Sequence, residues 1–223
     1  MVRLLLLALA ALTLGACNMV YSEKPLFTAA EAKAGPGLKR GIWIKRAPDC
    51  DVDLSRPVKE WPECAEPGRV GPRDIGDMKD ASKRSNYILV PGEPHVMQFE
   101  VKLDKDAKTL FMFMGVEPLK RDEKGRIVEM RLWMVQCGPP PPKEAETGAP
   151  PPPENETEEE RAARIEREAQ AMISSGVTKE PLEGLTIEAG MCKAVDPAAV
   201  RRAAAASKAW DTDGPTILYW VKK

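Results

Sequence analysis

The stretch HVMQFEVKLDKDAKTLFMFMGV (residues 95–116) decides the fold. Its first nine residues alternate between two sets of side chains, which is the period of a β-strand. The mostly apolar set comprises His95, Met97, Phe99, Val101 and Leu103. After a polar turn at residues 104–106, TLFMFMGV (residues 109–116) is apolar on both faces. A strand of this kind must be covered on both sides, so the sequence predicts a central strand here.

The flanking sequence extends the same sheet. KRDEKGR (residues 120–126) predicts a polar turn, and RIVEMRLWMVQC (residues 126–137) predicts a returning strand. Short turns join antiparallel neighbours, so we expect three adjacent antiparallel strands between residues 87 and 137. GIWI (residues 41–44) and ILYWV (residues 217–221) predict a first and a final strand.

Two helices follow the central strands. Thr157 and Glu160 fit a capping box before an apolar stripe of helical period that ends at about residue 175. Asp196 as N-cap and Pro197 in the first turn open a helix that reaches about Trp210. The predicted fold class is α+β: an antiparallel β-sheet, or a small sandwich or barrel, packed with two helices and stapled by disulfides.

The N-terminus has the three parts of a secretory signal. Arg3 supplies a positive start, residues 4–14 are apolar, and Gly15 and Ala16 are small. The apolar run is shorter than the roughly 18 residues needed to cross a bilayer. One interpretation of these residues is an ordinary secretory signal peptide. In this interpretation Cys17 has no special role.

LGAC (residues 14–17) resembles the lipobox of bacterial lipoproteins. The resemblance covers only the first 17 residues. It implies that the chain is cut before Cys17, that the thiol of Cys17 receives a diacylglycerol, and that the new amine is acylated with a fatty acid such as palmitate. The next residue is Asn18 rather than Asp, which by the same resemblance favours the outer membrane, facing the periplasm. The membrane is therefore an expected partner through this anchor.

The chain divides into three parts in this interpretation. Residues 1–16 are the signal peptide, and residues 17–40 are a lipid-anchored tether with one short helix, for which Thr28 and Glu31 form a capping box. Residues 41–223 form a single domain with a proline-rich insert at 138–155. The insert cannot build a core, so we expect an exposed spacer. A ligand for a proline-binding module is the alternative.

Four cysteines remain after Cys17 is assigned to the anchor. An even number in an oxidising compartment predicts two disulfides, and we expect Cys50–Cys64 and Cys137–Cys192. A zinc site is the rival interpretation, but zinc ligands usually come in closely spaced pairs, and none occurs here.

Charge and motifs give few signs of a partner or a reaction. Lys plus Arg (33) nearly balance Asp plus Glu (34), so we expect no nucleic-acid partner. The single histidine, His95, lies in no catalytic motif, and a Ser/His/acid triad built on it has no local support. Asp211 to Gly214 is better explained as a turn than as a calcium loop.

The methionines offer a sharper alternative. His95, Met97, Met112 and Met114 lie on neighbouring predicted strands, and imidazole and thioether groups suit Cu(I). These residue types resemble those of periplasmic copper carriers built on small β-barrels. Methionine is also a common core residue, and we favour that role, with no metal or other cofactor.

The function expected from the sequence is a non-enzymatic, lipid-anchored envelope protein. Its periplasmic domain would bind an envelope protein partner or serve a structural role. The alternatives are a periplasmic carrier of a small ligand or of Cu(I), and a hydrolase without a recognisable motif.

The first prediction concerns the anchor. Replacing Cys17 with Ala should abolish incorporation of labelled fatty acid, because the thiol that accepts the lipid is gone. The protein should then become soluble or keep its signal peptide. Unchanged incorporation in Cys17→Ala would exclude a lipid on this residue.

Overall fold

The structure is a computed structural model that describes residues 18–222 with gaps. The gaps are residues 36, 79, 81–82, 103–107, 140–156, 162–163, 165–177, 179, 189–190 and 212–215.

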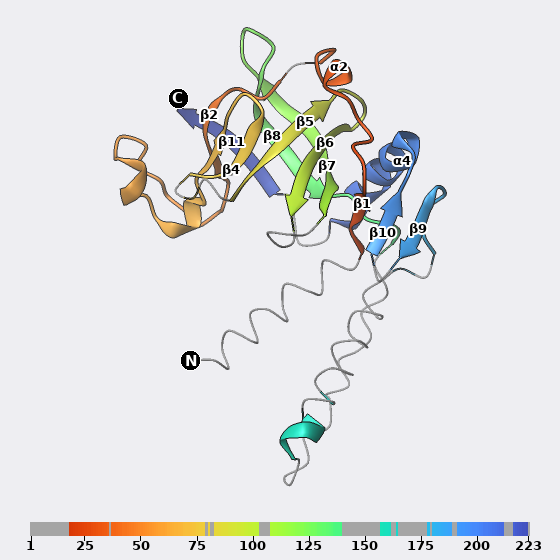
Figure 1. Cartoon of the computed structure of the whole chain (residues 1–223). Coiled ribbons are helices and arrows are strands. Elements are labelled where there is room, and N and C mark those ends of the chain that lie inside the picture. Colours follow the sequence, from red (N-terminus) through yellow and green to blue (C-terminus); the bar gives the residue numbers. More distant parts are fainter. Residues whose placement is uncertain are drawn as a thin grey trace.

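Eight antiparallel strands close into a barrel (Figure 1). They are β2 (Gly41–Lys45), β3 (Gly68–Val70), β4 (Asp74–Asp77), β5 (Arg84–Val90), β6 (His95–Lys102), β7 (Thr109–Arg121), β8 (Ile127–Met134) and β11 (Thr216–Lys222). Strands β2 to β8 pair with their neighbours in chain order. The last strand, β11, enters between β8 and β2 and closes the barrel.

A second layer covers one outer side of the barrel. Strand β1 (Val20–Ser22) pairs with β7, β10 (Met191–Ala194) pairs with β1, and β9 (Leu185–Glu188) pairs with β10. Helix α4 (Pro197–Ser207) packs on β7, β8 and β10, and the 3₁₀ turn η5 (Lys208–Trp210) continues it. The remaining short elements are α2 (Ala29–Ala32), η2 (Val58–Glu60) and η3 (Glu63–Ala65).

Strand β7 is covered on both faces, as its sequence predicts. Phe113 points outward into the core formed with β1 and α4, and its ring meets that of Phe27 edge-on at 6.1 Å between centroids. Val116 and Met114 point into the barrel. Gly115 lies directly under the indole of Trp133, where a Cβ atom would clash with the ring. The indole nitrogen of Trp133 donates to the Ala204 carbonyl of α4 at 2.8 Å, so this glycine lets the helix dock.

The other two cores lie inside the barrel and on its opposite side. Inside, Trp43, Met97, Ile127 and Met130 are buried, with other apolar side chains around them. Outside, the loop of residues 46–67 lies over β2 and β11, and Trp61 packs there on a third cluster with Ile42 and Ile44. Loop and second layer lie on opposite sides of the barrel (Figure 1).

Both expected disulfides are present in the structure. Cys50–Cys64 closes the loop of residues 46–67, and Cys137–Cys192 joins the chain after β8 to strand β10. The expected helix after Asp196 is α4, whose N-cap Asp196 accepts a hydrogen bond from the Ala198 amide. The other expected helix is described only at residues 158–161 and 164, and most of it lies outside the described residues. Most of the expected insert, 140–155, lies outside them too.

Two expectations need correction. The α+β label overstates the helices, because the described structure is mostly β-sheet with few helices. Residues 18–22 do not belong to the tether that was expected over residues 17–40, since Val20 is fully buried in strand β1 and Asn18 is 6% exposed. Residues 20–22 pair with β10 and β7, which lie far along the chain, so this part of the expected tether belongs to the sheet. The short helix was expected correctly, with its capping box between Thr28 and Glu31.

The second prediction tests the packing of the barrel interior. Met97 is 2% exposed, whereas Met112 on the neighbouring strand is only partly buried. Met97→Ala should therefore lower the free energy of unfolding by about 2–5 kcal/mol, and Met112→Ala by less. Urea unfolding of the two variants measures the difference. Equal, small losses would mean that Met97 is not enclosed by the barrel.

Candidate functional site: a pocket beside strands β2 to β4

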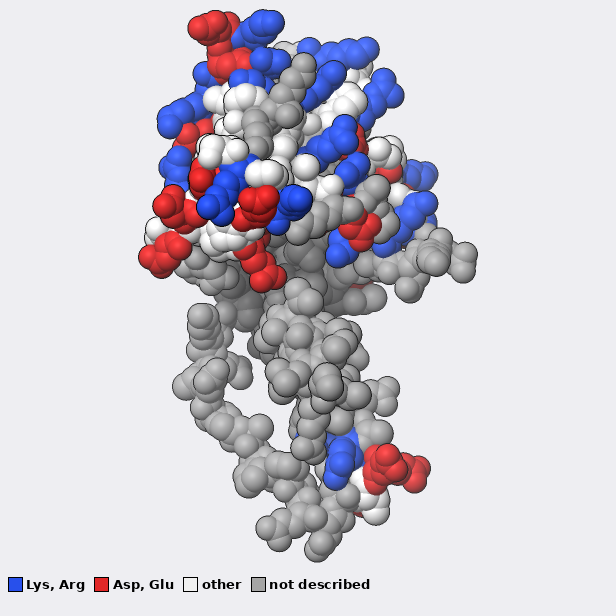
Figure 2. Space-filling view, turned by 90° about the vertical axis from the view of Figure 1, so that its left-hand side faces the viewer, with Lys and Arg blue, Asp and Glu red and all other residues white. Residues whose placement is uncertain are grey.

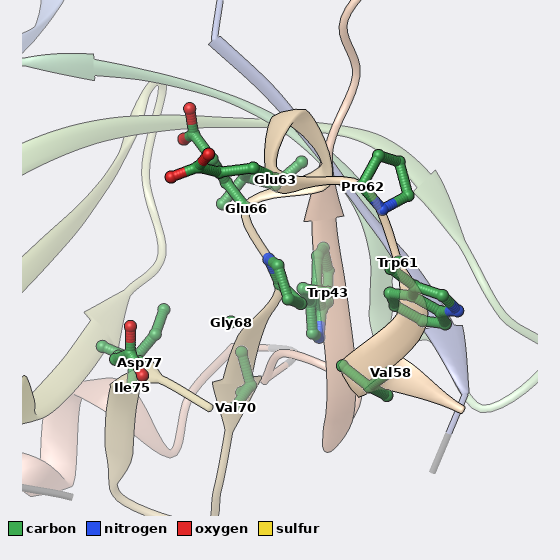
Figure 3. A pocket seen from close by; sticks show the side chains of 13 residues that line it. Trp43, Val58, Trp61, Pro62, Glu63, Glu66, Gly68, Val70, Ile75 and Asp77 are labelled. Carbon is green, nitrogen blue, oxygen red and sulfur yellow. The ribbon is translucent and has the colours of Figure 1, made fainter. Parts of the chain in front are cut away.

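The barrel carries a pocket of about 530 Å³. Its floor comes from side chains of the barrel interior, namely Trp43, Val70, Ile75 and Leu218. The loop of residues 46–67 forms a wall of the pocket. Figure 3 shows Trp43 between the loop that carries Trp61 and the strand that carries Asp77. The pocket thus joins the barrel interior to the loop that the Cys50–Cys64 disulfide closes.

A glycine in β3 creates the space. The strand register places Gly68 between Trp43 on β2 and Asp77 on β4. Gly68 puts no side chain beside the ring of Trp43, which lines the pocket although Trp43 as a whole is only 2% exposed. A Cβ atom at Gly68 would meet only the Gly76 carbonyl oxygen, at 3.4 Å, so a larger residue fits the backbone.

Backbone hydrogen bonds hold the two indoles of the pocket. Trp43 donates from Nε1 to the Lys39 carbonyl at 2.8 Å, and Trp61 donates from Nε1 to the Arg56 carbonyl at 3.1 Å. Trp43 is 2% exposed and Trp61 is 8% exposed, so each ring presents only a small part of its surface to the pocket. Because both N–H groups are occupied, that surface offers a ligand an apolar contact rather than a hydrogen bond.

The charged residues that line the pocket are all acidic: Glu63, Glu66 and Asp77. Lys45 pairs with Glu66 at 3.5 Å, but both side chains are exposed. The lysine therefore offsets only a small part of the negative charge of Glu66. The Asp77 carboxylate accepts a hydrogen bond from the Asp80 amide at 2.8 Å. The three carboxylates give the pocket a negative electrostatic potential. This potential is local, because acidic and basic side chains are interspersed over the face of the protein that Figure 2 shows.

Glu66 has an unusual backbone conformation. Its φ of 40° is the only positive φ of a non-glycine residue in the described part of the chain. Such conformations cost of order 1–3 kcal/mol and tend to occur where surrounding structure fixes a functional side chain. The turn ends η3 and sets Glu66 at the edge of the pocket.

The structure only partly brings together the four residues of the metal hypothesis. Met97 and Met114 are cross-strand neighbours inside the barrel, and Met134 lies beside Met114 on the next strand. His95 lies opposite Val116, and Met112 lies opposite Phe99. These two candidates are therefore four residues apart along the sheet, or about 13 Å.

His95 has a separate, local arrangement. Its Nδ1 lies 2.8 Å from the Gly92 carbonyl, and its Nε2 is buried with no hydrogen-bond partner in the structure. Burial is the main cause that lowers the pKa of His95 below its usual range. Among the described residues, no three His, Cys, Asp or Glu side chains gather as metal ligands.

The other candidate residues have simple outcomes. Cys17 lies outside the described residues, and so does most of the turn that begins at Asp211. The four remaining cysteines form the two disulfides. The pocket was not predicted from the sequence. The one local signal for the pocket was WPECAEP (residues 61–67), where an aromatic residue, prolines and acids surround a cysteine.

No helix in the described ranges is long and apolar enough to cross a bilayer. Comparison of the chain with protein-family models, curated proteins and solved structures finds no match.

Proposed function

We propose that this protein is a lipid-anchored envelope protein whose barrel binds a small ligand in the pocket beside β2 to β4. The pocket is the observation that carries the proposal. It has an apolar floor, two fixed indoles and a rim of three carboxylates. The lipobox-like residues 14–17 support the anchor and the periplasmic location.

The lining favours a ligand with an apolar body and a positive charge. Indole rings attract cations through their π-faces, and the rim carboxylates add charge complementarity. The floor residues Val70, Ile75 and Leu218 suit the apolar part. An organic ammonium ion combines these features. A lysine or arginine side chain of an envelope protein has the same chemistry, and a pull-down from native envelopes would detect such a partner.

A second candidate function is transport of a soft metal ion. Met97, Met114 and Met134 form a row across three adjacent strands, on the face that lines the barrel. Thioether ligands suit Cu(I). This row omits His95 and Met112, so it is a narrower site than the one expected from the sequence.

The third prediction tests the pocket. Gly68→Leu should fill the space over Trp43 and abolish binding of benzyltrimethylammonium, measured by calorimetry or tryptophan fluorescence. Gly37→Leu is the matched control, because a Cβ atom there meets nothing within 4 Å. Glu63→Gln should weaken binding by up to about fivefold, because an exposed ion pair contributes about 0.2–1 kcal/mol. Equal binding by the wild type and Gly68→Leu, both folded, would exclude this pocket as the site.

The fourth prediction tests the methionine row. Ag(I), a stand-in for Cu(I), should quench tryptophan fluorescence saturably, and Met114→Leu should abolish the effect by removing the middle thioether. Met78→Leu is the control, since Met78 packs against the third cluster outside the barrel. Absence of quenching in the wild type would exclude the soft-metal function.

A further inference from the structure

We infer that the face of the domain around Asn18 docks on the phospholipid surface, so that the barrel lies directly on the membrane. The inference rests on the proposed lipid on Cys17, and it goes beyond anchorage because it assigns one orientation to the domain. It follows from how firmly Asn18, the residue after Cys17, is held in the fold.

Asn18 is tied into the fold from several sides. Its side-chain nitrogen donates to the Gly138 carbonyl at 3.0 Å and to Gln136 at 3.3 Å. Its side-chain oxygen accepts from the Thr178 amide at 3.3 Å, and its carbonyl accepts from the Cys137 amide at 2.8 Å. Asn18 therefore cannot act as a flexible link.

The neighbours of Asn18 are themselves held firmly. Cys137 is joined to Cys192 of β10, which pairs with Val20 two residues after Asn18. Gly138 approaches Thr178 and the Glu180 carbonyl so closely that a Cβ atom would clash with both. Residues 18–20 are thus fastened to β10, to residues 136–138 and to Thr178.

The available reach is too short to lift this face away from the lipid. Adjacent Cα atoms are about 3.8 Å apart, and each headgroup layer is roughly 5–8 Å thick. A lipid on Cys17 would therefore hold Asn18 within the headgroup layer. A free tether over residues 18–40 would instead extend up to about 75 Å.

The chemistry of the surrounding surface is compatible with this contact. Near β1 and β10, the basic side chains are paired: Lys193 with Glu188 and Glu23 at 3.0 and 3.5 Å, and Lys108 with Glu23 at 3.0 Å. Glu180 and Glu183, before β9, are exposed acids, which a zwitterionic phosphatidylcholine surface tolerates. Ile187 of β9 is 42% exposed, although it is a large apolar side chain. The loop of residues 46–67, which lines the candidate pocket, lies on the other side of the barrel from β1, β9 and β10 (Figure 1), so this orientation places the pocket away from the lipid.

The experiment compares two exposed carboxylates in the intact lipidated protein, reconstituted in phosphatidylcholine vesicles. Glu180 lies beside Asn18, and Glu60 lies in the loop on the other side of the barrel. Carbodiimide-driven labelling with glycine ethyl ester, measured by mass spectrometry, should modify Glu180 about tenfold more slowly on vesicles, equivalent to about 1.4 kcal/mol of protection. Glu60 should react at the same rate with and without vesicles.

A linker variant supplies the control. Inserting Asn-Gly-Ser-Gly-Ser-Gly-Ser between Cys17 and Asn18 keeps an asparagine after the lipidated cysteine but adds free chain, so Glu180 should regain its reactivity on vesicles. If the intact mass shows the acyl groups and Glu180 reacts equally fast with and without the linker, the docked orientation is wrong and the anchor stands. If the mass shows no acyl groups, the anchor itself is wrong.

Discussion

Strand β7 has to be shielded from water on both faces, and the rest of the fold supplies the two covers. Each large apolar side chain that it buries contributes roughly 1.5–3 kcal/mol relative to its exposed state. Barrel closure covers the face with Met114 and Val116. The face with Phe113 needs a second layer, which β1 and α4 provide. One segment of the chain thus requires both the barrel and its outer layer.

The second layer depends on close contacts that few residues allow. Trp133 reaches the Ala204 carbonyl of α4 only because Gly115 beneath it has no side chain. Cys137–Cys192 then fastens the chain after β8 to β10. The Cys137 amide of this disulfide donates to the Asn18 carbonyl, so the feature that stabilises the layer also holds Asn18 in place. Packing and the proposed attachment to the membrane therefore share one small region.

Much of the sheet could be predicted from the sequence, because alternation and two-sided apolar runs reflect local burial. That information defined β6, β7, β8 and β11, and even count and loop closure gave the disulfides. The sequence left a sheet, a sandwich and a barrel open, because closure depends on the pairing of β11 with β2 across about 170 residues. Residues 20–22 are too short to show a strand pattern, and their partners are distant. The pocket depends on the absence of a side chain at Gly68 beside Trp43, and only the register shows this.

Closure by the last strand has a consequence for the order of folding. Until residues 216–222 are available, β2 and β8 are sheet edges with unpaired backbone groups, which can pair with other chains. Contacts of such long sequence separation form slowly. A chain that is synthesised from its N-terminus therefore exposes these two sheet edges until its last strand is present. The chain is prone to aggregate during this time. A chain truncated before β11 would expose the two edges throughout its lifetime.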